Sequence, residues 1–248
     1  MDRLLYIAMS GAKENMNGLA VRANNLANTG TVGFKADFEQ ARAMQAFGEG
    51  MPSRVFSMTE QPGQNFDAGA IIMTERDLDV AIQGDGWLAV QAPDGTEAYT
   101  RGGNLQLSAQ GMLETSSGLA VMGDDGPIQL PVPLAKLEIG NDGTISVLPQ
   151  GAPADAIAQV ARIKLVKPLN SEMEKGNDGL FRRKDGQLAE AAPDVNLLNG
   201  AIEGSNVNAV GEMTYMISLQ RQFELQVKMM KSAEDMDRQQ VQLLRIVG

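Results

Sequence analysis

The sequence predicts an α+β protein in which long N- and C-terminal α-helices pack as a coiled-coil-like pair. A central all-β domain, antiparallel and sandwich- or barrel-like, is inserted between them. Apolar and small residues recur with three- and four-residue spacing at both ends of the chain, which is typical of amphipathic helices. In the middle, short strand-like runs are separated by Gly, Pro, Asn and Asp clusters, which indicate turns. A chain of 248 residues is long enough for this organisation.

The N-terminal helix is predicted over residues 3–28. Asp2 precedes it as an N-cap and places a negative charge at the positive end of the helix dipole. Gly11 and Gly18 lie inside the helix, and each costs about 1 kcal/mol relative to alanine. We therefore expect a helix that is stable only when it is packed. The positions with helical spacing are Leu5, Ala8, Ala12, Leu19 and Leu26.

The C-terminal helix is predicted over residues 207–247 and is the stronger of the two. It contains no proline, and no glycine lies between Gly211 and Gly248. At a rise of 1.5 Å per residue it would be roughly 60 Å long, which is too long for a small domain to cover. We expect it to project or to pack against other subunits. Its apolar stripe consists of Met213, Met216, Ile217, Leu219, Phe223, Val227 and Met230.

Between the helices the pattern changes to short strands, including one expected over residues 162–167 (RIKLVK). Residues 36–76 have little pattern and are expected to be extended, with one helical turn near 37–45. The predicted segments are an N-terminal helical arm at 1–35, an extended connector at 36–76, a central β domain at 77–167, an irregular connector with short strands at 168–206, and a long C-terminal helix at 207–248.

Composition excludes several classes of function. The chain contains no cysteine and no histidine, so disulfides, thiolate sites and the commonest general base and metal ligand are absent. Residues 36–206 hold 12 Lys and Arg against 24 Asp and Glu, a net charge of −12, whereas the two ends are near neutral. An acidic centre argues against binding to nucleic acid. We expect no membrane-spanning helix and no cleaved signal peptide.

Six stretches combine an aspartate with a glycine, and such stretches occur both in calcium loops and in hairpin turns. They are GDG at 84–86, PDG at 93–95, DDG at 124–126, NDG at 141–143 and 177–179, and KDG at 184–186. None has the acidic spacing and closing glutamate of an EF-hand loop. Asp-Gly and Asn-Gly pairs favour two-residue turns because both residues tolerate positive φ. We therefore predict hairpin turns.

Two other patterns resemble catalytic sites. Asp77 and Asp79, two apart on an expected strand, would share a face as a carboxylate pair for glycoside hydrolysis. Ser10 and Lys13 have the S-x-x-K spacing, but the partner motifs S-D-N and K-T-G are missing. We predict no catalytic, cofactor or metal site. The 15 methionines suit either a helix core or an adaptable binding surface.

Three separated motifs resemble those of bacterial flagellar rod and hook proteins. The first comprises SGA at 10–12, ANNLAN at 23–28 and T-x-GFK at 31–35. The second comprises LDVAIQGDGWLAV at 78–90 and YTRGGNLQLSAQGML at 99–113, and the third is EGSNVNAVGEMTYMISLQRQFE at 203–224. The motifs follow the family order and span the chain. Trp87-Leu88 after the GDG turn, with the chain length and the VARIKLVK run, is most similar to proximal-rod members.

The resemblance implies a structural subunit of the flagellar basal-body rod, without catalysis or cofactor. Such a subunit would leave the cell through the flagellar type III export apparatus. It would then polymerise helically into the periplasm-spanning drive shaft that transmits torque, with the terminal arms forming the inner tube. The implied partners are copies of itself, other proximal- and distal-rod proteins, the export apparatus in transit and the surrounding periplasmic ring. Arg22 departs from the family pattern and is expected to alter one helix contact.

Three alternatives remain open from the sequence: a distal-rod subunit, a carboxylate-based periplasmic cell-wall hydrolase, and a coiled-coil adhesin. In the rod interpretation, the asparagines at 24, 25 and 28 bond backbone groups or neighbouring subunits where the helix ends. Gly30 and Gly33 then turn the chain. The residues expected to carry assembly or the motifs are Leu5, Ala8, Ala12, Leu19, Asn24, Asn25, Leu26, Ala27, Asn28, Thr31, Gly33, Phe34, Lys35, Leu78, Asp79, Gly84, Gly86, Trp87, Tyr99, Thr100, Arg101, Glu203, Ser205, Asn206, Val207, Asn208, Met213, Met216, Ile217, Phe223, Val227 and Met230.

Overall fold

A computed structural model describes residues 2–38, 41–45, 55–59, 63–151, 153 and 157–247. Helices at both ends of the chain flank a β-rich middle, so the α+β prediction is confirmed. The chain divides into two compact units. The first unit consists of Met1–Thr29, Ala36–Asn65 and Val207–Gly248, and the second consists of Gly30–Lys35 and Phe66–Asn206.

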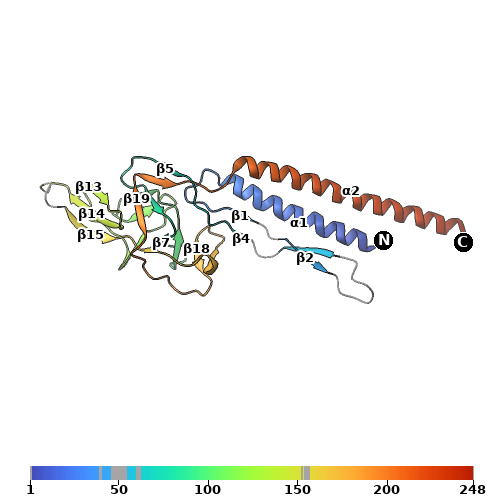
Figure 1. Ribbon diagram of the computed structural model, residues 1–248, viewed down its shortest axis with the longest axis horizontal. Coiled ribbons are helices and arrows are strands. Elements are labelled where there is room, and N and C mark those ends of the chain that lie inside the picture. Colours follow the sequence, from blue (N-terminus) through green and yellow to red (C-terminus); the bar gives the residue numbers. More distant parts are fainter. Residues whose placement is uncertain are drawn as a thin grey trace. The chain divides into compact units, whose positions relative to one another are not determined.

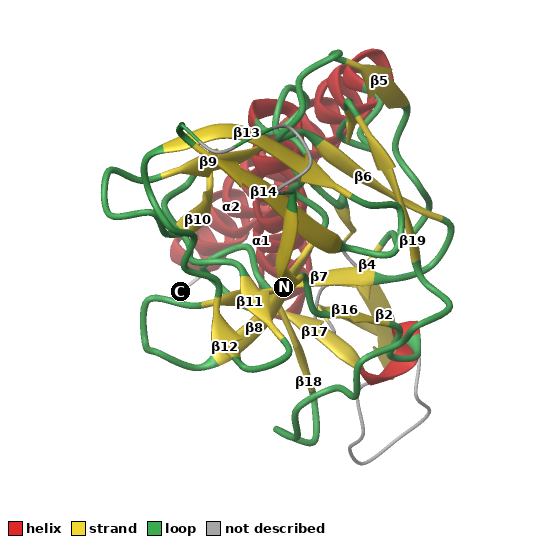
Figure 2. Ribbon diagram, turned by 90° about the vertical axis from the view of Figure 1, so that its left-hand side faces the viewer, coloured by secondary structure: helices red, strands yellow, loops and turns green. Residues whose placement is uncertain are grey.

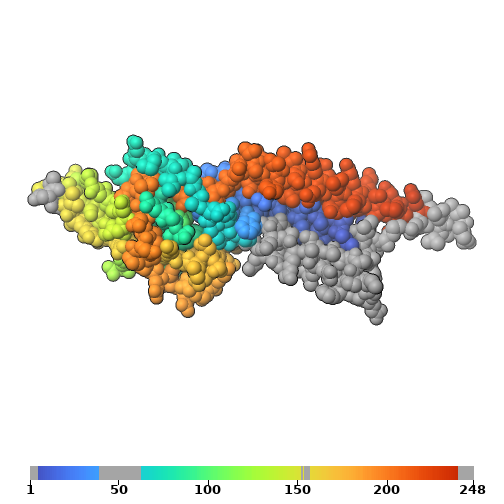
Figure 3. All heavy atoms as spheres, viewed as in Figure 1, coloured from blue at the N-terminus to red at the C-terminus, as the bar shows by residue number. Residues whose placement is uncertain are grey.

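The first unit is built around helices α1 (Asp2–Ala27) and α2 (Ala209–Val247), which lie side by side (Figure 1). Figure 3 shows the surface of α1, in blue, directly against that of α2, in orange to red. Strand β3 also lies against α1. The strands of this unit are β1 (Asp37–Phe38), β2 (Ala41–Gln45), β3 (Val55–Thr59) and β4 (Gly63–Gln64).

The prediction of a helical turn near 37–45 is wrong, because this stretch forms strands. β1 pairs antiparallel with β4, and β2 pairs antiparallel with β3 from Ala41 to Gln45. Extended backbone exchanges hydrogen bonds with a neighbouring strand, and this pairing replaces the internal bonds that a helical turn would need.

In its described residues, the second unit consists of strands, turns and one short 3-10 helix, η1 (Asn170–Glu172). Its strands are β5 (Ile71–Met73), β6 (Val80–Gln83), β7 (Trp87–Gln91), β8 (Glu97–Thr100), β9 (Leu105–Leu107), β10 (Leu113–Thr115), β11 (Met122–Gly123), β12 (Gly126–Pro127), β13 (Leu134–Ile139), β14 (Thr144–Pro149), β15 (Ala158–Arg162), β16 (Leu165–Val166), β17 (Met173–Lys175), β18 (Phe181–Arg183), β19 (Asn196–Asn199) and β20 (Ala201–Glu203).

Within the described residues, these strands form several small antiparallel sheets and no closed barrel. The largest sheet has the order β16-β7-β8-β18-β17, and a three-stranded sheet has the order β13-β14-β15 (Figure 2). The remaining strands pair as β19-β6, β20-β5, β10-β9 and β11-β12. The main core contains Leu88, Leu113 and Ile145, and a second cluster surrounds Trp87 and Phe181.

The single strand predicted over 162–167 is wrong, because the chain changes sheet within it. Arg162 ends β15 and pairs with Thr144, whereas β16 pairs with β7. Between them, the Ile163 N–H donates to the Gly143 carbonyl and the Lys164 N–H donates to the Met122 carbonyl. Successive residues therefore bond to different neighbours, and the alternating sequence pattern contains no sign of this change.

The predicted hairpin turns are confirmed where an aspartate-glycine stretch joins two paired strands. This holds for β7 and β8, β11 and β12, β13 and β14, and β17 and β18. The glycines there, at positions 95, 126, 143 and 179, all have positive φ. The other two stretches also have positive-φ glycines, but the strands that they follow do not pair with the next strand.

Candidate functional site: a buried ion cluster where the motifs meet

The carboxylate of Glu203, in β20 of the second unit, is the centre of a buried ion cluster. Its Oε1 accepts hydrogen bonds from Lys35 Nζ at 2.7 Å and from the Gly69 N–H at 2.9 Å. Its Oε2 accepts one from Arg101 Nη1 at 3.0 Å. Lys35, Arg101 and Glu203 are only 1%, 5% and 2% exposed. Residues far apart in the sequence thus share one desolvated site, and we call these three the Glu203 cluster.

The two cations of the Glu203 cluster make further contacts. Lys35 Nζ also donates to the Asp67 carbonyl at 2.7 Å, and Arg101 Nη2 donates to the Gly84 carbonyl at 2.7 Å. The Arg101 guanidinium lies over the Trp87 ring, 5.5 Å from its centroid. Burial lowers the pKa of Lys35, while the hydrogen bond and charge of Glu203 act to raise it. The cluster therefore depends on Glu203 to keep Lys35 charged in a desolvated site.

The segment containing Gly33 is bound closely to the same site. The Gly33 N–H donates to the Glu203 backbone carbonyl at 2.7 Å. Gly33 has φ +69°, and a Cβ there would lie 2.2 Å from the Arg101 carbonyl carbon. Both the backbone conformation and the lack of space therefore require glycine. The Asn206 N–H donates to the Phe34 carbonyl at 3.3 Å, so residues on either side of Lys35 and Glu203 are joined as well.

Lys175, in β17, completes the enclosure of this segment. Its Nζ lies 4.0 Å from the centroid of the Phe34 ring and donates to the Lys35 carbonyl at 3.0 Å. Lys175, Asp67 and Gly69 were not predicted as site residues. The sequence contains no signal for them, because their partners lie far along the chain and two of the three act through backbone groups.

The first unit contains a second polar site, around Asn25 of α1. Asn25 is fully buried. Its Nδ2 donates to the Asp37 carbonyl at 2.7 Å, and its Oδ1 accepts the Asp37 N–H at 2.9 Å. The amide thus satisfies the backbone of Asp37 as a neighbouring strand would.

Arg22 joins the two helices beside Asn25. Its Nη1 donates to both carboxylate oxygens of Glu212 in α2, at 3.0 and 3.2 Å, and its guanidinium lies 4.7 Å from the Tyr215 ring centroid. Asn25 Nδ2 also lies 3.4 Å from Glu212 Oε1. The residue that departs from the family pattern therefore makes an ion pair between α1 and α2. Neither Glu212 nor Asp37 was predicted as a site residue.

The other amides act at helix ends. Asn28 Nδ2 donates to the Asn24 carbonyl at 2.9 Å and so satisfies a carbonyl at the end of α1. The Asn24 side chain itself is exposed. At the start of α2, Asn208 Oδ1 accepts the Gly211 N–H at 3.1 Å, which is an N-cap.

The predicted residues, taken together, differ widely in exposure. The buried ones are Ala8, Ala12, Asn25, Gly33, Lys35, Asp79, Gly86, Trp87, Tyr99, Arg101 and Glu203. The partly exposed ones are Leu5, Leu19, Leu26, Asn28, Phe34, Leu78, Thr100, Ser205, Asn206, Val207, Met216, Phe223 and Met230. The exposed ones are Asn24, Ala27, Thr31, Gly84, Asn208, Met213, Ile217 and Val227. The apolar stripe of α2 thus divides into a partly covered face and an exposed face.

The acidic residues considered as catalytic candidates have structural surroundings. Asp77 lies in an exposed turn before β6, so it does not share a strand face with the buried Asp79. The carboxylate of Asp79 lies 3.7 Å from Arg76 Nη1. Turn aspartates such as Asp94 and Asp142 accept hydrogen bonds from the threonine two residues later, and these bonds lower their pKa. The carboxylates therefore support turns and ion pairs.

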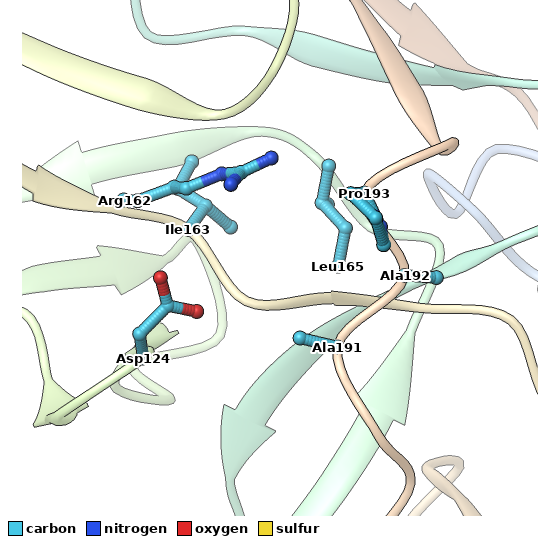
Figure 4. Close-up of a pocket in the computed structure, with 7 residues that line it drawn as sticks. All are labelled: Asp124, Arg162, Ile163, Leu165, Ala191, Ala192 and Pro193. Atoms are coloured by element: carbon cyan, nitrogen blue, oxygen red, sulfur yellow. The ribbon is translucent and has the colours of Figure 1, made fainter.

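A cavity of about 230 Å³ lies in the second unit (Figure 4). Arg162, one of its lining residues, donates Nε–H to the Asp142 carbonyl at 3.0 Å. The cavity is lined by Asp124, Arg162, Ile163, Leu165, Ala191, Ala192 and Pro193.

Among the described residues, no group of three acidic side chains could hold a metal ion. Among these residues, too, no helix is both long and apolar enough to cross a bilayer.

Both polar sites tie distant chain segments together through ion pairs and hydrogen bonds, an arrangement typical of a structural, assembly-type protein. Comparison with known families agrees. Residues 5–35 match the model for flagella basal body rod proteins, residues 81–147 match the D1 domain of flagellar hook proteins FlgE/F/G, and residues 198–243 match the C-terminal region of flagellar basal body rod FlgEFG proteins.

Relatives that match over nearly the whole chain are also flagellar basal-body rod proteins. The chain is 44% identical to the flagellar basal-body rod protein FlgF of Escherichia coli K12, with 95% of each chain covered. It is 41% identical to FlgF of Salmonella typhimurium LT2 over 98% of this chain and 99% of the relative. It is 31% identical to the rod protein FlgG of Buchnera aphidicola from Acyrthosiphon pisum over 94% of this chain and 96% of the relative.

The chain belongs to the flagellar basal-body rod protein family. It is a structural rod subunit of the flagellar basal body that assembles with other rod proteins, and it is not an enzyme. The sequence interpretation of the family and the class of function is therefore confirmed, and the cell-wall hydrolase alternative is set aside.

Proposed function

We propose that this chain is a subunit of the proximal rod, polymerised helically into the drive shaft that crosses the periplasm and transmits torque. The observation that carries the proposal is the Glu203 cluster, because it brings together residues of all three family motifs: Lys35 of T-x-GFK, Arg101 of YTR and Glu203 of EGSN. Identities of 44% and 41% to two FlgF relatives, against 31% to a FlgG relative, support the proximal position.

The Glu203 cluster suits a shaft subunit for a mechanical reason. Lys35 lies eight residues after the end of α1, and Glu203 lies six residues before the start of α2. The two segments that lead to the helices are therefore clamped to one buried carboxylate. A force transmitted along either of these segments would therefore reach the second unit at the Glu203 cluster.

The helical arms at 1–35 and 207–248 are proposed to form the inner tube as a coiled-coil-like pair. Support comes from α2, where the buried and partly exposed residues recur with three- and four-residue spacing, as in a heptad pattern. These residues are Glu212, Met216, Leu219, Phe223, Gln226, Met230 and Ala233. The sandwich-like β domain at 77–167 would lie outside the tube. The segments 36–76 and 168–206 would connect this domain to the helical arms.

The proposed neighbours are copies of this chain and other rod proteins, with the export apparatus in transit and the surrounding periplasmic ring as further partners. Exposed apolar side chains on both helices support packing between subunits. They include Tyr6, Met9 and Met16 on α1, and Val210, Met213 and Ile217 on α2. Because a lone subunit exposes these residues, assembly would bury them. Export without a cleaved signal peptide is part of the same proposal.

Deletion of either helical arm tests the proposal. A chain lacking residues 1–30 or 215–248 should fail to enter purified basal bodies and should not restore motility to cells that lack the gene. Normal rods and motility after either deletion would contradict it. Labelling of the full chain in purified basal bodies would then locate it, and a signal from the distal part of the rod would refute the proximal position.

A further inference from the structure

Strand β5 of the second unit exposes three consecutive apolar side chains. Ile71, Ile72 and Met73 are 49%, 51% and 63% exposed. Successive side chains of a strand point to opposite faces, so β5 presents apolar groups on both faces. A strand at the surface of a soluble domain usually has one polar face. β5 therefore presents an apolar surface on both faces, and exposed apolar surface of this kind is typical of an interaction site.

The outer edge of β5 also has backbone groups that face away from its partner strand. In the described residues β5 pairs only with β20, in a register that places Ile72 opposite Ile202. The Gly204 N–H donates to the Ala70 carbonyl at 2.8 Å, and the Thr74 N–H donates to the Gly200 carbonyl at 2.8 Å. Antiparallel strands bond through every second residue. The N–H and C=O groups of the residues at 71 and 73 therefore point away from β20.

Native proteins normally protect such an edge with lysine, proline or a bulge. The segment 70–74 reads AIIMT and contains neither lysine nor proline, and its register with β20 is regular. β5 ends at Met73, and two residues later Glu75 has φ +59°, which turns the chain away. The unprotected edge is therefore short, and it can accept one short extended segment.

We propose that β5 is a docking edge on which an extended segment of a neighbouring rod subunit adds as a further strand. The outward N–H and C=O groups suit a partner with free backbone groups, which a lipid tail or the surface of a helix does not offer. The apolar side chains on both faces select a segment that is apolar as well. A neighbouring rod subunit supplies such a polypeptide, so this inference rests on the proposed function.

The chain contains no cysteine, so a single introduced thiol reports on one position. Met73→Cys places the thiol on the docking edge. Leu188→Cys is the matched control, because Leu188 is 62% exposed in the same unit. Labelling by a polyethylene-glycol maleimide is compared between the purified chain and purified basal bodies. We expect the thiol at position 73 to react at least about tenfold more slowly in basal bodies, and the thiol at position 188 to keep its rate. Equal rates at position 73 in the two preparations would overturn the inference.

A photoreactive maleimide, benzophenone-4-maleimide, attached to the thiol of the Met73→Cys chain before assembly identifies the occupant. After irradiation of basal bodies, mass spectrometry should find position 73 joined to a peptide of a second rod subunit. A cross-link to lipid or to a ring protein would overturn the inference. Absence of the Leu188→Cys chain from basal bodies would instead contradict the proposed function. Its presence, together with a freely reactive thiol in the assembled Met73→Cys chain, would refute only the docking edge.

The substitution Ile72→Lys tests the apolar requirement without a thiol. Because Ile72 is half-exposed, the purified variant should unfold at nearly the wild-type temperature, whereas its incorporation into basal bodies should fall about tenfold or more. Leu188→Lys should leave incorporation unchanged. Wild-type incorporation of the Ile72→Lys chain would count against the docking edge.

Discussion

Glu203 balances two buried cations, and this single carboxylate determines whether Lys35 and Arg101 can remain desolvated. Removal of water from a charge costs several kcal/mol, and the cost is recovered only when an opposite charge lies in good geometry. Here both cations contact the same carboxylate at 2.7 and 3.0 Å. The loss of Glu203 would therefore affect three chain segments together.

Glu203→Gln should lower the free energy of unfolding by about 3–5 kcal/mol, because it leaves Lys35 and Arg101 buried without a counterion. Urea denaturation of the purified chain measures this change. Glu190→Gln, at an exposed position, is the control and should be close to neutral. A cost below about 1 kcal/mol for Glu203→Gln would show that the cluster is not a major source of stability.

Gly33→Ala should destabilise the second unit by at least about 2 kcal/mol, because alanine is strained at positive φ and its Cβ would meet the Arg101 backbone. Gly30→Ala is the matched control, since its Cβ would meet nothing within 4 Å. Thermal unfolding of both variants makes the comparison. Equal midpoints would show that the segment before Lys35 can relax away from Arg101.

Tyr99 should ionise late, because burial raises its pKa to about 12. Its hydroxyl donates to Glu97 Oε1 at 3.0 Å and accepts the Ala189 N–H at 2.6 Å. The pKa of Tyr99 in the folded chain exceeds the usual value of about 10. The buried neutral hydroxyl therefore stabilises the folded state fully below pH 10, and this stabilisation is lost as the pH rises through 12. The tyrosinate absorbance of the wild type minus that of Tyr99→Phe should therefore appear near pH 12. Its appearance near pH 10 would contradict the buried geometry.

At the scale of elements, the Asn25 side chain positions β1 beside the end of α1, because it exchanges hydrogen bonds with the backbone of Asp37 as a neighbouring strand would. The exchange of two hydrogen bonds with Asp37 explains why the chain after the helix is extended, where the sequence pattern had indicated a helical turn. Asn24 and Asn25 are neighbours in the sequence, but only Asn25 is buried. The amide run therefore contains one residue that folds the subunit and one whose side chain remains available on the surface.

Asn25→Ala should cost about 2–3 kcal/mol, because both backbone groups of Asp37 lose their partner. Asn24→Ala should change the free energy of unfolding by less than about 0.5 kcal/mol. Guanidinium denaturation of the purified chain measures both values. If Asn24→Ala nevertheless prevents incorporation into basal bodies, that side chain acts in assembly. Similar stability of the two variants would contradict the strand-like role of Asn25.

Sequence reasoning succeeded where structure is local and failed where it depends on distant partners. The helices follow from three- and four-residue spacing, and the turns follow from the positive φ of glycines such as Gly95 and Gly143. Lys35 and Glu203 were both marked by family motifs, but their pairing spans 168 residues and has no local signature. For the same reason, the change of sheet within 162–167 was missed.

At the scale of the whole molecule, the two units do not follow the order of the chain. Residues 30–35 come directly after the first helix and yet belong to the β-rich unit, whereas 36–65 belong to the helical unit. The cause lies in the Glu203 cluster and the Gly33 contact, which fix 33–35 among strands of the second unit. A boundary placed between helix and strands in the sequence would therefore cut through a buried site.

This interleaving predicts that a fragment of residues 30–206 is more stable than a fragment of residues 66–206. The shorter fragment lacks Lys35 and Gly33, so Glu203 keeps Arg101 as its cation but loses the ammonium and the backbone bond of the Gly33 segment. A loss of about 3–5 kcal/mol would lower the unfolding temperature of a unit this size by roughly 10 °C.

Circular dichroism melts of the two fragments make the comparison, with Lys35→Met in the longer fragment as the control. This variant keeps the Gly33 segment but removes the ammonium, so its unfolding temperature should lie between those of the other two. Equal temperatures for all three would show that the stability of the β-rich unit does not depend on residues 30–35. An ordered series would show that the segment after the first helix is part of the fold of the second unit.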